Sequence, residues 1–152
     1  MFEKENTPIW IGMVLMAGFF LLCAGNAIAQ TTWTVDQVGG DFTTIQSCVD
    51  AAVTGDTCRV NPGTYAENID FAGKNITLVS TAGPEVTVID GGGSGSVVTI
   101  ENAETQDAVL DGFTITNGYS YSGGGIICRD SSPRIENCLI AGNTADDDVA
   151  PV

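Results

Sequence analysis

The chain has 152 residues and a formal net charge of −14 at neutral pH, with 19 acidic and 5 basic side chains. Such a negative surface repels nucleic acid and anionic membranes, so the charge disfavours both as partners. The sequence contains no histidine, which excludes the commonest general base and every catalytic triad built on imidazole.

Residues 1–29 have the pattern of a secretory signal peptide. Ile9 to Ala24 is an apolar run without charge, and Ala27-Ile28-Ala29 provides a cleavage site before Gln30. The run is shorter than the roughly 20 apolar residues that a membrane span needs. We therefore expect cleavage after Ala29 and a secreted or cell-surface protein with no membrane span. An uncleaved signal anchor is the alternative.

Residues 30–56 are expected to form a short strand, at 33–38, and one amphipathic helix. Thr43 and Gln46 have the spacing of a capping box, and Gly55 supplies a stop. The apolar positions Ile45, Cys48, Val49 and Ala52 recur on one helical face. A single helix ahead of many strands is expected to cap the first turn of a stack, whose core would otherwise be exposed.

Residues 57–145 are predicted to consist of short strands and turns without a further helix. The strands are expected at 58–60, 68–71, 75–80, 86–89, 97–100, 108–116, 126–128 and 135–140. The absence of intervening helices excludes a βαβ sheet, while an antiparallel sandwich remains possible from strand spacing alone.

A repeat near the end of this segment favours parallel stacking. The apolar residues Leu110, Phe113 and Ile115 recur, at one constant offset along the chain, as Ile135, Cys138 and Ile140. A short β-rich unit that repeats with a period of this order is typical of a solenoid. Residues one turn apart should then share a column, with Leu110 next to Ile135, Phe113 next to Cys138 and Ile115 next to Ile140. We expect three to four turns.

Five segments carry a more specific pattern. They are Gly40-Asp41-Phe42-Thr43-Thr44-Ile45-Gln46, Pro62-Gly63-Thr64-Tyr65-Ala66-Glu67-Asn68-Ile69, Asn75-Ile76-Thr77-Leu78-Val79, Asp111-Gly112-Phe113-Thr114-Ile115-Thr116-Asn117-Gly118 and Ser132-Pro133-Arg134-Ile135-Glu136-Asn137-Cys138. These segments resemble pectin-lyase-like proteins of the bacterial secreted type. The resemblance implies an all-β, right-handed parallel β-helix with one N-terminal capping helix. It implies no single activity, because that superfamily includes lyases, esterases, hydrolases and non-catalytic surface proteins.

Catalytic residues cannot be assigned from the sequence. The segment from Gly63 to Glu67 resembles the first conserved stretch of pectin methylesterases, but the later segments of such a site have no match. We expect Gly63 to form a turn, and Glu67 to be solvated or to hold a backbone N–H. Two carboxylate pairs, Asp107 with Asp111 and Asp130 with Glu136, could meet on the outer wall for glycoside chemistry. Solvated side chains are the simpler interpretation.

No cofactor is predicted, and the Cys and His spacings of a zinc site are missing. Calcium is conceivable because carboxylates and turn carbonyls are its ligands. Asp146-Asp147-Asp148 lacks the spaced pattern of a calcium loop, so residues 146–152 are interpreted as an acidic tail. Relatives usually continue into further turns at this point. Either the chain is a piece of a longer solenoid, or the tail protects an open edge.

Four cysteines follow the expected cleavage site, in two pairs with equal spacing: Cys48 with Cys58, and Cys128 with Cys138. We expect a Cys48–Cys58 bridge from the capping helix to the first turn, worth about 3 kcal/mol in the chain-entropy model. A Cys128–Cys138 bridge is also favoured, with two small buried thiols as the alternative.

Tyr119 and Tyr121, in a loop rich in Gly and Ser, are candidate ligand contacts because aromatic faces can stack on sugar rings. The sequence therefore favours a secreted or cell-surface interaction or adhesion module, non-catalytic, with polysaccharide or cell-surface components as partners. The competing hypothesis is a carbohydrate-active enzyme related to pectin methylesterases or pectate lyases, incomplete in this chain. A third is a structural piece of a long surface solenoid.

Overall fold

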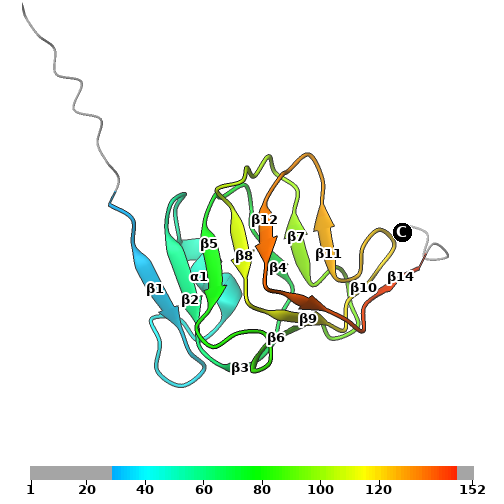
Figure 1. Cartoon of the computed structure of the whole chain (residues 1–152), viewed down its shortest axis with the longest axis horizontal. Helices are drawn as coiled ribbons and strands as arrows, with labels where there is room; N and C mark the ends of the chain where they lie inside the picture. Colours follow the sequence, from blue (N-terminus) through cyan, green and yellow to red (C-terminus); the bar gives the residue numbers. More distant parts are fainter. Residues whose placement is uncertain (1–28, 147–152) are drawn as a thin grey trace, which may run out of the picture.

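The computed structural model describes residues 29–146, which form a parallel β-solenoid of about five turns with one short helix. The elements are β1 (Thr32–Val35), α1 (Ile45–Ala51), β2 (Thr57–Val60), β3 (Gly63–Ala66), β4 (Ile69–Asp70), β5 (Thr77–Ser80), β6 (Thr87–Asp90), β7 (Val98–Ile100), β8 (Val109–Asp111), β9 (Thr114–Thr116), β10 (Tyr119–Ser120), β11 (Ile126–Cys128), β12 (Arg134–Glu136), β13 (Leu139–Ile140) and β14 (Thr144–Ala145). The turns follow one another from β1 to β14 along the stack (Figure 1).

Three sheets run along the solenoid, and every pairing between their strands is parallel. Sheet A has the order β1-β2-β5-β8-β12, sheet B has the order β3-β6-β9-β13, and sheet C has the order β4-β7-β11. A small fourth sheet pairs β10 with β14. The parallel prediction is confirmed, and an antiparallel sandwich is excluded.

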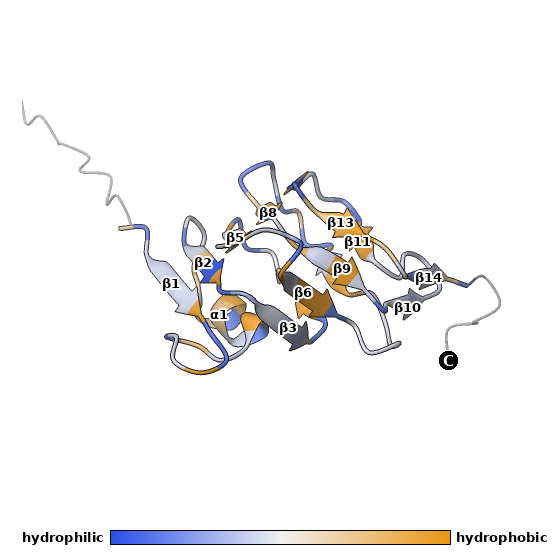
Figure 2. Cartoon of the chain, turned by 60° about the horizontal axis from the view of Figure 1, so that its bottom comes forward, coloured by the Kyte–Doolittle hydropathy of each residue, from blue (hydrophilic) through white to orange (hydrophobic). Residues whose placement is uncertain are grey.

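Columns of apolar side chains fill the interior. In sheet A one column consists of Cys58, Leu78, Leu110 and Ile135, and in sheet B another consists of Tyr65, Ile89, Ile115 and Ile140. The predicted neighbours Leu110–Ile135 and Ile115–Ile140 are therefore confirmed. Figure 2 shows the hydrophobic colour recurring on β6, β9 and β13. Each turn buries the inward face of the one before it, which no single turn can do alone.

The number of turns is larger than predicted, because the length of chain in each turn varies. In sheet A, Thr57 pairs with Thr32 in the turn before it and with Thr77 in the turn after it. Thr77 also pairs with Val109, which lies one turn further along. The step from Thr57 to Thr77 is the shortest of these, and the step from Thr77 to Val109 is the longest. One fixed period therefore reveals only part of the stack.

One strand lies where the sequence indicates a turn. β3 is not among the expected strands, although it is a full member of sheet B and pairs with β6 along its whole length. Gly63 opens this strand rather than forming a turn. The segment is short and follows Asn61 and Pro62 directly, and such turn-forming residues conceal the strand in the sequence.

Two predicted strands are each divided by a sharp corner. The expected strand at 108–116 is β8 and β9, separated at Gly112, whose φ is 83°. The expected strand at 135–140 is β12 and β13, separated at Asn137, whose φ is 50°. These left-handed conformations turn the chain from sheet A to sheet B, and they suit Gly and Asn.

The capping helix is confirmed, but its first turn differs from the prediction. The N-cap is Thr44, whose side chain accepts a hydrogen bond from the Ser47 N–H, so the expected capping box of Thr43 with Gln46 is wrong. The helix ends at Ala51, before Gly55. The apolar residues Ile45, Cys48 and Val49 of the helix and its C-cap Ala52 are buried as expected.

Charged side chains from the solenoid hold both ends of α1. The Glu67 carboxylate accepts hydrogen bonds from the backbone N–H groups of Ile45 and Gln46, each at 2.9 Å. The Lys74 ammonium donates to the carbonyl oxygens of Val49 and Asp50, each at 2.7 Å. A negative group at the N-terminus and a positive group at the C-terminus are the favourable arrangement for a helix dipole.

One of the two predicted disulfides is present. Cys48 of α1 is bonded to Cys58 of β2, with a Cα–Cα distance of 6.2 Å. Cys128 and Cys138 are free thiols, so the prediction of a second bridge is wrong. They lie on different walls of the last turn: Cys128 ends β11 of sheet C, and Cys138 follows the corner between sheets A and B, with Sγ 3.7 Å from the Leu110 carbonyl oxygen.

Some predictions fall outside the described residues. The expected signal peptide lies almost wholly in residues 1–28, and residues 147–152 contain most of the expected acidic tail. Among residues 29–146, no helix is long and apolar enough to cross a membrane.

Replacing Phe113 with Ala should destabilise the protein by about 4 kcal/mol, because the side chain is fully buried and the truncation leaves a cavity. Val38→Ala, at a site that is 95% exposed, is the control and should change the unfolding free energy little. Urea unfolding followed by circular dichroism measures both. Equal effects of the two substitutions would contradict the core assigned here.

Peptide mapping of the unreduced protein, alkylated after denaturation, should find Cys48 and Cys58 in one linked peptide. Cys128 and Cys138 should each carry the alkylating group, because the structure leaves both as thiols. Finding these two residues linked in unreduced protein would show that the structure assigns them wrongly.

Candidate functional site

A groove of about 440 Å³ lies where the outer face of sheet C meets the loop that follows β10. Its lining residues are Ser96, Thr99, Glu101, Ser120, Tyr121, Ser122, Ile127 and Arg129. Thr99 of β7 and Ile127 of β11 are paired neighbours, so the floor consists of outward side chains on adjacent turns. We call this surface the Tyr121 groove.

Tyr121, a residue that is 49% exposed, supplies the groove with an aromatic ring. Sugar rings present apolar C–H faces that can pack against such a ring. The three serines and Thr99 surround it with hydroxyl groups that can both donate and accept hydrogen bonds. The groove therefore combines a stacking surface with polar groups that are suited to a polyhydroxylated ligand.

A paired charge lies in the same groove. Arg129 Nη1 is 3.1 Å from Glu101 Oε1, so the two charges largely neutralise each other. This oxygen is buried and accepts no hydrogen bond of acceptable geometry within the described residues. A buried oxygen is out of reach of a ligand, so the ion pair with Arg129 is a fixed part of the groove wall.

The two tyrosines expected to contact a ligand lie in different surroundings. Tyr121 lines the groove, whereas Tyr119 is outside the lining and donates its hydroxyl hydrogen to the Asp146 carboxylate. This hydrogen bond to a negative group raises the pKa of Tyr119 above its usual value. Tyr119 pairs with Thr144 in the small β10–β14 sheet, which gives it a structural role.

A second groove, of about 450 Å³, lies among the turns that lead into sheet A. Its lining residues are Gln30, Thr54, Gly55, Asn75, Thr77, Asp107 and Arg134. The sequence does not predict this groove, because its residues come from turns and from the first positions of β5 and β12, whose relative positions depend on the coiling. Asp107 and Arg134 give it one acidic and one basic group.

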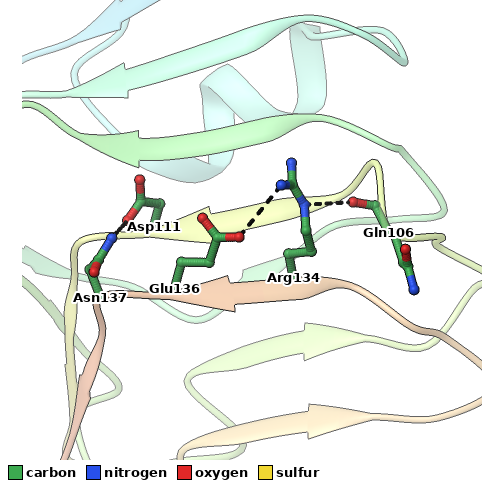
Figure 3. A network of polar contacts seen from close by, with 5 residues as sticks. All are labelled: Gln106, Asp111, Arg134, Glu136 and Asn137. Atoms are coloured by element: carbon green, nitrogen blue, oxygen red, sulfur yellow. Dashed lines mark hydrogen bonds and ion pairs between the residues drawn. The ribbon is translucent and has the colours of Figure 1, made fainter.

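A network of polar contacts covers sheet A beside this groove (Figure 3). Arg134 Nε donates to the Gln106 carbonyl oxygen at 3.0 Å, and its Nη1 is 3.5 Å from Glu136 Oε1. Asn137 Nδ2 donates to Asp111 Oδ1 at 2.8 Å. Each of the two carboxylates therefore has a local polar or charged partner.

The carboxylates that are neighbours differ from the predicted pairs. Asp111 and Glu136 face each other as cross-strand partners in β8 and β12. Asp107 precedes β8, which Asp111 ends, and Asp130 precedes β12, which Glu136 ends. In the part of the chain that the structure describes, no group of three or more Cys, Asp or Glu residues is placed to hold a metal ion.

Glu104, which the sequence analysis did not single out, is the polar centre of three successive corners. Only 2% of its surface is exposed, and its carboxylate accepts hydrogen bonds from Gly73 N, Asn102 N and Ser131 Oγ at 2.7 to 2.8 Å. These three residues lie in the corners before β5, β8 and β12. Burial raises the pKa of Glu104, but the hydrogen bonds together lower it by more than burial raises it. The resulting pKa lies below the usual value.

Asp56 has the corresponding role at the first turns. Its buried carboxylate accepts hydrogen bonds from Thr31 N at 2.8 Å, Val53 N at 3.1 Å and Trp33 Nε1 at 3.2 Å. The hydrogen bonds from Thr31 and Val53 hold the pKa of Asp56 below its usual value against the effect of burial. Together with Glu67, this residue shows that part of the acidic composition is structural.

No protein-family model, curated protein or solved structure matches this chain. The fold therefore defines its class: a parallel β-solenoid of about five turns, covered at its first turn by a short disulfide-linked helix.

Acid should destabilise the protein in the range where Glu104 and Asp56 take up protons. Because their folded pKa values are depressed, their contribution is complete above the unfolded values near 4 and is lost as the pH falls through the folded values. Glu104→Gln should cost about 2 kcal/mol at pH 7 and distinctly less at low pH.

Glu85→Gln is the matched control, because it makes the same change at an exposed site. Its unfolding free energy should follow that of the unsubstituted protein at every pH. Urea unfolding at several pH values measures the three proteins. A Glu104→Gln effect that does not change with pH would exclude the charged carboxylate as its origin.

Proposed function

We propose that this chain is a non-catalytic, secreted or cell-surface β-solenoid module that binds polysaccharide in the Tyr121 groove. The observation that carries the proposal is the combination of the half-exposed Tyr121 with the hydroxyl groups of three serines and Thr99 in one groove. An aromatic platform beside hydroxyl groups matches a sugar, which has apolar C–H groups for stacking and hydroxyls that donate and accept hydrogen bonds.

The charge of the protein favours a neutral or esterified polysaccharide over an acidic one. The net charge of −14 opposes the approach of free carboxylates on a polymer. In the groove, Arg129 is already paired with Glu101, so it adds little attraction for an anion. Binding should therefore depend on stacking and hydrogen bonds, and it should change little with salt.

The resemblance of several segments to bacterial secreted pectin-lyase-like proteins supports this proposal. That superfamily includes many proteins that act on polysaccharides, and it also includes non-catalytic surface proteins. The segment from Gly63 to Glu67, which is the one most similar to methylesterases, supports a structural role rather than a catalytic one. Its Glu67 carboxylate accepts hydrogen bonds from two backbone N–H groups of α1.

The second groove favours a competing function, that of a carbohydrate-active enzyme related to pectin methylesterases or pectate lyases. Asp107 and Arg134 face the same space there, and an acid and a cation are the groups that such chemistry needs. Methanol release or unsaturated products from esterified pectin would support this enzyme and contradict a non-catalytic module.

Tyr121→Ala should weaken binding to neutral glycans about tenfold, which corresponds to the loss of one aromatic stacking contact of about 1.4 kcal/mol. Tyr119→Phe is the control, since Tyr119 lies in β10 outside the groove and the substitution removes only the hydroxyl that bonds to Asp146. A glycan array identifies the ligand, and calorimetry with the strongest hit measures all three proteins.

The controls separate the function from the site. If the unsubstituted protein binds no glycan above background, the polysaccharide function is wrong. If it binds a glycan and Tyr121→Ala binds equally well, the function stands but the Tyr121 groove is not the site.

A further inference from the structure

The last described turn leaves one end of the solenoid open. We call this surface the open end; it is formed by β11, β12, β13 and β14. Each of these strands stands last in the order of its sheet, so within residues 29–146 one edge of each has no neighbouring strand. Such edges can pair with another chain.

The apolar columns of the core reach this surface uncovered. Ile135 is 39% exposed and Ile140 is 50% exposed, whereas Leu110 and Ile115, which precede them in the same columns, are fully buried. Cys128 is also exposed, although its partner in the preceding turn of sheet C, Ile100, is buried. Figure 2 shows the hydrophobic colour of β11 and β13 at this end. The open end is therefore a cross-section of the core.

The opposite end of the stack is covered. Ile45, Cys48 and Val49 of α1 are fully buried against the first turns. In the described part of the chain, the core columns are therefore uncovered at the open end. On a second copy of the chain, the surface that can continue these columns is again the open end. Such a contact uses the same patch twice and closes after two copies.

We propose that the open end binds the open end of a second copy of this chain, with β12 of the two copies paired antiparallel around Ile135. The backbone of β12 is oriented for this pairing. Arg134 N donates to the Ala108 carbonyl oxygen at 2.9 Å, and the Glu136 carbonyl oxygen accepts from Gly112 N at 3.1 Å, so both residues point their backbone groups toward β8.

Because backbone groups alternate along a strand, the N–H and C=O of Ile135 point to the free edge. An antiparallel strand centred on the same residue would exchange both hydrogen bonds with Ile135 of the second copy. In this arrangement the two isoleucine side chains lie side by side on the core face, where each covers the other's exposed surface.

The charges on β12 are self-complementary in this register. Arg134 and Glu136 flank Ile135 on the outer face, 55% and 45% exposed (Figure 3). Antiparallel pairing around Ile135 places Arg134 opposite Glu136 of the second copy, twice in each dimer. Parallel pairing in register would place like charges opposite each other, which is unfavourable. The charge pattern therefore selects the antiparallel dimer.

Sedimentation velocity over a range of concentrations tests the proposal on the full expressed chain, whose N-terminus is identified by mass spectrometry. The unsubstituted protein should form a dimer and no larger species. Ile135→Lys should make it monomeric, because the substitution places a charge in the dimer core. Arg134→Glu and Glu136→Arg should each raise the dissociation constant about tenfold, because each creates two pairs of like charges.

Mixing the two charge-reversal variants should restore dimerisation as a heterodimer, because opposite charges then face each other again. Arg59→Glu is the matched control: it makes the same change at an exposed site on β2, in the interior of sheet A, and should leave the dissociation constant unchanged. Circular dichroism confirms that each variant is folded.

Three results would overturn the proposal. One is an unsubstituted protein that is monomeric at every concentration, which would leave the open end to a partner of another kind. The second is a dimer whose dissociation constant does not respond to the single charge reversals. The third is the absence of a heterodimer when the folded reversal variants are mixed.

Discussion

The structure depends on one constraint: every inward side chain must be covered by the side chain at the same position of the next turn. The column Cys58, Leu78, Leu110 and Ile135 shows how this works, because each member lies next to its counterpart in the adjacent turn, and one turn alone is too thin to bury its own inward face. The hydrophobic effect therefore acts along the stack rather than toward a centre. This is why the helix at the first turn matters. α1 covers the columns at the first described turn, and Glu67, Lys74 and the disulfide fix it in place.

A second layer of interactions holds the corners. The turns that join the sheets contain backbone N–H groups that no strand can pair, and buried carboxylates satisfy several of them. Asp56 and Glu104 accept three hydrogen bonds each, which offsets the cost of burying a charge. The acidic composition thus has two roles. Some carboxylates keep the surface negative and soluble, and a few are structural acceptors that become weaker when protonated.

The sequence predicted the parts of the fold that repeat and missed the parts that do not. The recurrence of the Leu110 pattern at Ile135 predicted the parallel register, because an apolar ladder leaves a period in the sequence. The predicted number of turns was too low, because the step from Thr57 to Thr77 is shorter than this period and the step from Thr77 to Val109 is longer. The Tyr121 groove could be predicted only through its tyrosine. Glu101 and Arg129 meet across turns, and a pairing of that kind leaves no local signal. Cys128 and Cys138 share a turn without sharing a wall, and spacing alone could not show this.

The hydrogen bonds of Glu104 also bear on how the molecule comes apart. A solenoid held only by nearest neighbours can fray from an exposed end, one repeat at a time, with little effect on the interior. Glu104 connects the corner before β5, through Gly73, with the corner before β12, through Ser131. Detaching the turn that contains β12 therefore removes the Ser131 donor from the Glu104 carboxylate. The same carboxylate also binds Gly73 in the corner before β5, two turns further into the stack. The side chain makes unravelling more cooperative, so that distant repeats tend to be lost together rather than in sequence.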